Sequence, residues 1–235
     1  MKIVILHGQS HEGSTCMVAR KLAEKVTKRL KEESVVQEFF FPRDFSESCL
    51  GCYTCYNSDL CQCPHYEKLQ PVTDAMLAAD LLILESPVYV YHATGAMMNF
   101  LDHLGTWWII HRARPEMMSK QAVVISTAAG GGMKSTCQDM ADSLEMWGVR
   151  KLYRLGFGVQ ATNPSQIPAG IQKRIEKKTD RCADKIARDP YGKNMNKRAK
   201  KWFYLVRMMH KQFTSEPDYG YWEKKGWHAK SRPWK

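Results

Sequence analysis

Five short apolar runs that alternate with helix-like stretches constrain the fold of this chain more than any other feature of its sequence. The apolar runs, which we expect to be strands, are residues 3–7, 35–41, 81–84, 121–127 and 151–159. Apolar residues at helical spacing predict helices over residues 15–30, 133 to about 147, and 171–187, and a further helix that ends near residue 79. Strands that alternate with helices form a parallel sheet covered on both faces. In such sheets, ligands bind at the carboxyl ends of the strands.

Length and composition narrow the class of protein. The chain has 235 residues, of which 44% are hydrophobic, and this is enough apolar surface for a folded core. The mean hydropathy is −0.45. Because a bilayer span needs roughly 20 consecutive apolar residues, and no run approaches that length, we exclude a transmembrane protein. The first apolar run is also shorter than the core of a signal peptide, so we expect a cytoplasmic protein.

The positive charge is concentrated at the carboxyl-terminal end. Residues 171–235 hold 19 Lys and Arg against 7 Asp and Glu, whereas residues 1–170 hold 16 against 17. We therefore expect a nearly neutral α/β domain over residues 1–190 and a basic extension over 191–235. The high net charge describes the extension and not a site of chemistry, so nucleic acid is an unlikely partner.

The loop after the first predicted strand has the features of a phosphate site. Gly8 and Gly13 are spaced as in a nucleoside-triphosphate loop, but Ser14 stands where the phosphate-binding lysine belongs. The three-glycine dinucleotide pattern is also incomplete. The free N–H groups of a helix amino terminus, with the hydroxyls of Ser10, Ser14 and Thr15, suit the terminal phosphate of FMN. The alternative is that these residues only cap the helix.

Two further loops follow predicted strands and suit a flat ring system. Residues 86–102 bring aromatic and apolar side chains after a buried strand, and residues 127–132 include three consecutive glycines. Ring faces and unobstructed backbone can contact a heterocycle. A turn that only closes the sheet is the alternative for each loop.

Together the three loops resemble the NAD(P)H-dependent FMN reductase and flavodoxin-like superfamily over residues 1 to about 188. The matching stretches are Gly-x-Ser-x-x-Gly-Ser-Thr, Ser-Pro-Val-Tyr with Gly-Ala-Met-Met-Asn-Phe-Leu-Asp-His, and Thr-Ala-Ala-Gly-Gly-Gly. The resemblance implies a flavodoxin-like three-layer sandwich with a five-stranded parallel sheet. It also implies bound FMN, with NAD(P)H as co-substrate. Many relatives have Arg at the position of His11 and Asn at that of Ser14.

The same resemblance assigns residues to the flavin. The phosphate would be surrounded by Ser10, Ser14, Thr15 and Cys16. The isoalloxazine would be flanked by Pro87, Val88, Tyr89, Val90, Tyr91, Thr127, Ala128, Gly130 and Gly131. His92 adjoins this set and is a candidate hydrogen-bond donor to the flavin.

Five cysteines lie within fifteen residues of a segment, 43–66, that we expect to be an insertion in the α/β domain. Cys49, Cys52, Cys55 and Cys61 have a compact four-thiolate spacing suited to an iron–sulfur cluster, and Cys63 is a fifth thiol. The spacing resembles that of the iron–sulfur flavoproteins, which implies a [4Fe–4S] cluster near the FMN. A zinc site and metal-free thiols are the alternatives.

The basic extension contains an amphipathic helix. Its expected apolar stripe consists of Trp202, Leu205, Val206, Met209 and Phe213. Packing on its own domain or on a second subunit is the leading interpretation, and an anionic membrane surface is the alternative. The aromatic segment 218–227 is expected to dock as well. A homo-oligomer is therefore expected.

These observations favour an FMN-dependent oxidoreductase that moves electrons from NAD(P)H, or from a reduced protein donor, to a small-molecule or protein acceptor. In such enzymes the cofactor carries the chemistry and the protein supplies position and electrostatics, so we assign no catalytic side chain. The alternatives are an iron–sulfur flavoprotein or flavodoxin-like electron carrier without its own turnover, and a flavin-binding regulatory protein. Flavodoxins tend to be acidic, which counts against the carrier.

Overall fold

The computed structural model describes residues 1–192, 196–213 and 215–234, with side chains left out for 211–213. Its centre is a parallel sheet of five strands in the order β2-β1-β3-β4-β5. The strands are β1 Lys2–His7, β2 Val35–Phe40, β3 Leu81–Pro87, β4 Gln121–Ala128 and β5 Lys151–Gly158. All five lie where the apolar runs predict them. The middle strand β3 is buried along nearly its whole length, as its continuous apolar run requires.

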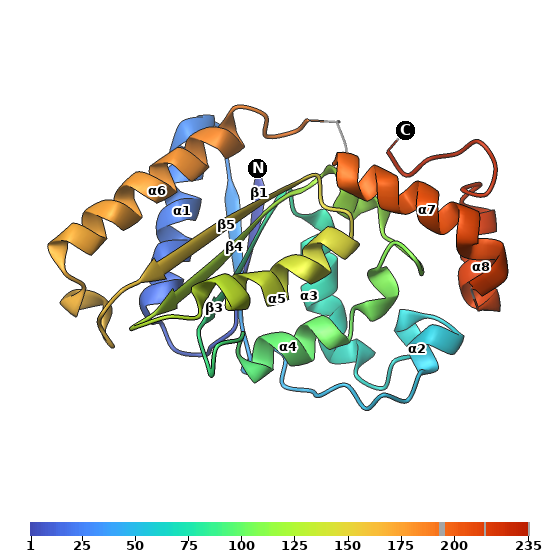
Figure 1. Cartoon of the computed structure of the whole chain (residues 1–235), viewed down its shortest axis with the longest axis horizontal. Coiled ribbons are helices and arrows are strands. Elements are labelled where there is room, and N and C mark those ends of the chain that lie inside the picture. Colours follow the sequence, from blue (N-terminus) through green and yellow to red (C-terminus); the bar gives the residue numbers. More distant parts are fainter. Residues whose placement is uncertain (193–195, 214, 235) are drawn as a thin grey trace.

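Helices cover both faces of the sheet and make the predicted three-layer sandwich (Figure 1). One face carries α1 (Ser14–Leu30) and α6 (Ala169–Ala187), which pack on the odd-numbered apolar residues of the strands. The other carries α3 (Tyr66–Ala78), α4 (Gly95–Asp102) and α5 (Met133–Met146). The five-stranded parallel sheet and the flavodoxin-like α/β class are thus confirmed.

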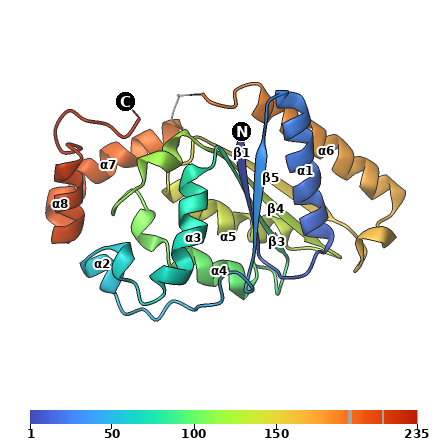
Figure 2. The ribbon, with the colours of Figure 1, turned by 180° about the vertical axis from the view of Figure 1, so that it is seen from behind.

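The cysteine-rich segment 43–66 follows the edge strand β2. It contains a short helix α2 (Thr54–Asn57) and a 3₁₀ turn η1 (Leu60–Gln62), and it is otherwise irregular. Figures 1 and 2 show it beside the carboxyl-terminal end of α4. The segment is therefore held against the α/β domain as an appended loop, and it adds no strand to the sheet.

The carboxyl-terminal extension folds back onto its own chain. Helices α7 (Lys197–Phe213) and α8 (Glu216–Lys224) lie at the end of the molecule away from α1 and α6 (Figure 2). Phe203 of α7 stacks on Trp222 of α8, with ring centroids 4.9 Å apart. Both pack on the segment between α4 and β4, where Ile109 and Met118 are buried. None of the helices in the described ranges combines the length and apolarity needed to cross a bilayer.

Most of the predicted apolar stripe of α7 does not pack on this chain. Trp202, Leu205 and Met209 are 38%, 38% and 41% exposed, and among the stripe residues whose side chains are described only Val206 is buried. The side chain of Phe213 lies outside the described residues. The buried face consists of Ala199, Phe203, Val206 and His210. Because α7 is apolar around most of its circumference, spacing alone does not select a face, and the stack on Trp222 does.

The docking of the extension is testable in α7. Phe203→Ala removes a fully buried ring and should cost about 3–5 kcal/mol of stability in the extension. Met208, which is 76% exposed on the same helix, is the matched control, and Met208→Ala should stay within about 0.5 kcal/mol. Denaturant unfolding followed by tryptophan fluorescence measures both, because Trp222 and Trp227 contact Phe203. Equal effects would contradict the observed face.

Candidate functional site

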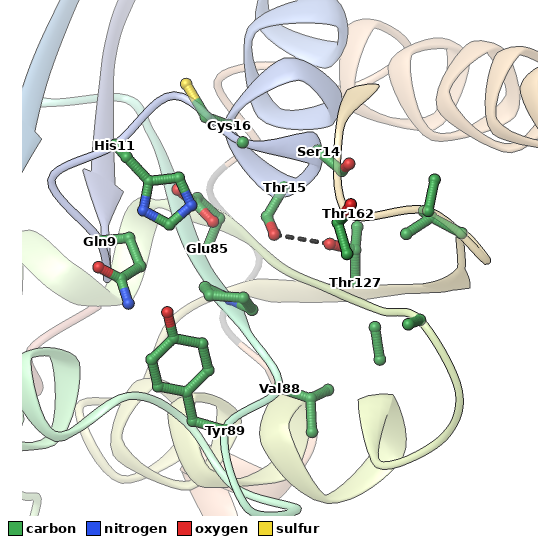
Figure 3. Close-up of a pocket in the computed structure, with 16 residues that line it drawn as sticks. Gln9, His11, Ser14, Thr15, Cys16, Glu85, Val88, Tyr89, Thr127 and Thr162 are labelled. Carbon is green, nitrogen blue, oxygen red and sulfur yellow. Dashed lines mark hydrogen bonds between the residues drawn. The ribbon is translucent and has the colours of Figure 1, made fainter. Parts of the chain in front are cut away.

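A cavity of about 310 Å³ opens at the carboxyl edge of the sheet, where the loops after β1, β3, β4 and β5 meet (Figure 3). It is lined by Gln9, His11, Gly13, Ser14, Thr15, Cys16, Glu85, Pro87, Val88, Tyr89, Thr127, Ala128, Ala129, Val159, Ala161 and Thr162. Eight of the residues that the resemblance assigned to the flavin are among them. This is the edge at which ligands bind in sheets of this kind.

Close packing of two loops shapes one side of this cavity. The hydroxyl of Thr94 donates to the carbonyl of Gly8 at 2.6 Å. A Cβ at Gly8 would lie 2.8 Å from Thr94 Oγ1 and 3.1 Å from the carbonyl oxygen of Glu85. Position 8 is therefore restricted to glycine by the approach of the loop that follows β3.

The amino terminus of α1 points its open backbone donors into the cavity. Gly13 is the N-cap, and the first donor bonded inside the helix is the N–H of Met17, which bonds to the carbonyl of Gly13 at 3.0 Å. The N–H groups of Ser14, Thr15 and Cys16 precede that donor, and all three residues line the cavity. The first turn of α1 contains no acidic residue. Such a terminus attracts an anion such as phosphate.

A buried hydrogen bond joins this terminus to the end of β4. Thr15 Oγ1 lies 2.7 Å from Thr127 Oγ1, and both side chains are almost fully buried (Figure 3). The bond fixes the first turn of α1 against the sheet. The wall of the cavity is therefore held in place by residues that also face the ligand space.

Glu85 is a buried acid at the base of the cavity, and the sequence analysis did not identify it. Its Oε1 lies 2.7 Å from Nδ1 of His7, the residue beside it in the neighbouring strand. Within the described part of the chain, Oε2 of Glu85 has no hydrogen-bond partner. Burial raises the pKa of Glu85, and the hydrogen bond from His7 only partly offsets this. A charged residue that ends an apolar strand was the available signal.

Glu85 makes stability depend on pH. Its raised pKa means that the folded chain keeps a proton that the unfolded chain loses above about pH 4.3, so stability falls as pH rises toward the folded pKa. Glu85→Gln cannot lose this proton. The Tm of the variant should therefore fall less than that of wild type as the pH is raised above about 5. Glu33→Gln, at an exposed position, is the control and should keep the wild-type slope.

The turn after β3 carries residues that do not line the cavity. Val90 and Tyr91 have left-handed φ angles of 50° and 66° in a two-residue turn closed by reciprocal backbone bonds between Tyr89 and His92. A left-handed β-branched residue stores strain of about 1–3 kcal/mol. Val90 is 86% exposed. Ser10, Val90, Tyr91, Gly130 and Gly131 are absent from the lining of this cavity, as is His92, whose Nδ1 bonds to the carbonyl of Ala93 at 2.7 Å.

A second cavity, of about 220 Å³, lies between the cysteine-rich segment and the end of α4. Its lining includes Cys49, Cys52, Cys55 and Cys63, together with His65, Asp102 and His103. Cys61 is exposed and does not line it. Three of the four predicted ligands are therefore brought together, and the fourth thiol at the cavity is the one that the spacing does not require. All eight cysteines carry free thiols.

Arg112 holds the cysteine-rich segment in place. Its guanidinium donates to the backbone carbonyls of Cys55, Tyr56 and Ser58, the last at 3.0 Å. The same group pairs with Asp218 of α8, with Nη1 and Oδ1 3.3 Å apart, and His111 Nδ1 lies 2.8 Å from Oδ2 of Asp218. Arg112 and Asp218 are both buried. The extension therefore supports the loop that carries the thiols, which sequence reasoning did not anticipate.

Removing the carboxylate tests this support. Asp218→Asn leaves the guanidinium of Arg112 buried without its counter-charge, which should cost about 3–5 kcal/mol in the stability of the docked extension. The half-buried thiol of Cys55 should then react faster with iodoacetamide in metal-free protein, whereas the exposed Cys49 should not change. Glu216→Gln, at an exposed position of the same helix, is the control. Unchanged labelling of Cys55 would contradict the role given to Asp218.

The fold and the first cavity define an α/β protein in which a helix amino terminus borders a cavity at the carboxyl edge of the sheet. The sequence model for NADPH-dependent FMN reductases matches residues 1–159. The chain belongs to this family, and the predicted family is confirmed.

Curated proteins named iron–sulfur flavoproteins are similar to this chain at below 30% identity. One from Archaeoglobus fulgidus is 28% identical over 141 residues, which cover 59% of this chain and 58% of that protein. Another, from Methanocaldococcus jannaschii, is 26% identical over 149 residues, covering 60% of this chain and 69% of that protein. The chain thus spans little more than half of the first relative.

Solved structures share the fold at low identity. An NADH:FMN oxidoreductase in its apo form has a TM-score of 0.54 at 19% identity and covers 79% of this chain and 88% of its own. An FMN-dependent NADH-azoreductase from Bacillus anthracis, in complex with FMN, has a TM-score of 0.57 at 10% identity and covers 80% and 100%. At these identities the likeness establishes the flavodoxin-like fold alone.

Proposed function

We propose that this chain is an FMN-dependent oxidoreductase that takes electrons from NAD(P)H or a reduced protein donor and passes them to an acceptor. The observation that carries the proposal is the open amino terminus of α1 at a cavity on the carboxyl edge of the sheet. Membership of the FMN reductase family supports it. Bound FMN would supply the chemistry, which is acceptance of a hydride or of single electrons.

The residues around the cavity suit the two ends of this cofactor. The N–H groups of Ser14, Thr15 and Cys16 and the two adjacent hydroxyls would bind the phosphate, with no nearby lysine needed. Glu85 lies at the base of the same cavity, and in its neutral form it has an O–H that could donate a hydrogen bond to the cofactor. The apolar wall for the ring system would come from Pro87, Val88, Tyr89, Thr127 and Ala128. Ser10, Val90, Tyr91, Gly130 and Gly131 remain proposed contacts outside the lining.

We further propose that the second cavity holds an iron–sulfur cluster. Thiolates are the ligands such clusters use, and here they come from one short segment around a single cavity. The curated relatives named iron–sulfur flavoproteins support the same cofactor. Helix α4 leads from the loop of the first cavity to the wall of the second, and its eight residues span about 12 Å. Electrons from a flavin would have a short route to such a cluster.

The alternative is an electron carrier without its own turnover, and the cysteine cavity is the observation that favours it. Such a carrier would accept electrons at one centre and release them from the other to a protein partner. Steady-state oxidation of NADH or NADPH by the flavin-loaded chain, with an artificial acceptor, distinguishes the two. Turnover supports the oxidoreductase, and flavin reduction only by a protein donor supports the carrier.

We propose that the exposed face of α7 is the contact of a homo-oligomer. Trp202, Leu205, Met208 and Met209 are all exposed on this helix. Apolar surface of this kind usually marks a contact. Light scattering tests the oligomer, and co-sedimentation with anionic vesicles tests the membrane alternative raised by the basic charge of the extension.

The choice of cofactor is testable by titration. Apo-protein should bind FMN at one per chain and more tightly than FAD, because the site lacks the pyrophosphate glycine pattern. Ser14→Ala removes a hydroxyl at the phosphate end and should weaken FMN binding about tenfold, as loss of one charge-assisted hydrogen bond does. Thr27→Val, near the other end of α1, is the control. Tighter binding of FAD, or no flavin binding at micromolar concentration, would refute the assignment.

A further inference from the structure

We infer that Cys63, and not Cys61, is the fourth cysteine ligand of the cluster site, together with Cys49, Cys52 and Cys55. The inference rests on the proposed cluster and assigns this chain's own residues to it. It departs from the spacing Cys-x2-Cys-x2-Cys-x5-Cys, which selects Cys61. It follows instead from where the segment places each sulfur.

Cys63 faces the cavity. It lines the cavity with the other three thiols, and its Sγ lies within 4.8 Å of ring nitrogens of His65 and His103 on the inner wall. Cys63 therefore lies where the cysteine-lined and the histidine-lined parts of this cavity meet.

Cys61, in contrast, is held away from the cavity by the local backbone. It lies in the middle of the η1 turn, where Asp59 is the N-cap and its side chain accepts the backbone N–H of Cys61 at 3.2 Å. Its thiol is exposed and contacts the side-chain amide of Gln62. Bringing Cys61 to the cavity would require η1 to unwind and the cap of Asp59 to break. Cys63, the residue after this turn, needs no such change.

The histidines beside Cys63 form an oriented pair that supports the inner wall. His103 is 3% exposed, and its Nδ1 donates to the carbonyl of Asn99 at 2.7 Å. Because that carbonyl only accepts, Nε2 of His103 is the acceptor that faces Nδ1 of His65 at 2.9 Å. Such an orienting bond is also found behind metal-bound histidines. A single metal ion on Cys63, His65 and His103 is therefore the competing occupant.

The test compares four full-length chains purified without oxygen and reconstituted with iron and sulfide: wild type, Cys49→Ser, Cys61→Ser and Cys63→Ser. Iron and acid-labile sulfide per chain, with the visible and EPR spectra of the cluster, are the readouts. Cys63→Ser and Cys49→Ser should lose or convert the cluster, with iron below about a tenth of wild type where it is lost. Cys61→Ser should match wild type. FMN per chain shows that each variant has folded.

Each other outcome overturns the inference in an identifiable way. If Cys61→Ser loses the cluster and Cys63→Ser keeps it, the spacing was the better guide, and the proposed cluster stands. If wild type holds iron or zinc without sulfide, and His103→Ala loses it, a single ion on Cys63, His65 and His103 occupies the cavity instead. If wild type binds no metal yet binds FMN, the cluster and its ligand assignment both fail, and the flavin oxidoreductase remains.

Discussion

The hydrogen bonds of Thr94 connect the parts of this molecule on which its function depends. Its hydroxyl donates to the carbonyl of Gly8 and accepts the N–H of Met97, and its own N–H donates to Ser86. One buried side chain thus fixes the loops after β1 and β3 to each other and also caps α4. The first cavity lies on one side of this point, and α4 leads from it to the second cavity, which the cysteines line. The hydrogen bonds of Thr94 therefore help to position both cavities.

The sheet and the first cavity were predictable because both depend on local pattern. A continuous apolar run such as Leu81–Leu84 is typical of a strand that is buried on both faces of a sheet. The loops that follow parallel strands all lie at the same edge of the sheet. The ligand-facing Glu85 escaped prediction because its environment comes from His7, 78 residues earlier in the chain. The face of α7 escaped because its partner, Trp222, lies in the next helix.

The cysteine segment shows the limit of spacing as evidence. Intervals between cysteines state which thiols can reach a common centre, and five thiols within fifteen residues leave several sets of four open. The choice among them depends on backbone conformation, and here the Asp59 cap of η1 turns Cys61 outward. Arg112 fixes the rest of the segment by donating to its backbone carbonyls. The spacing of the cysteines could not predict this role of Arg112. The position of Arg112 depends in turn on its ion pair with Asp218, which is distant in the sequence.

Two acidic residues, Glu85 and Asp218, are buried in different electrostatic surroundings. Asp218 faces the guanidinium of Arg112 and the ring of His111, so its charge is compensated by neighbours and its role is to hold structure. Glu85 is hydrogen-bonded to His7, and burial favours its neutral form. Its second oxygen is buried and has no hydrogen-bond partner among the described residues, so the neutral acid keeps an unused hydrogen bond. The charged side chain of Asp218 thus holds structure, whereas the neutral form of Glu85 keeps an O–H that can donate a hydrogen bond.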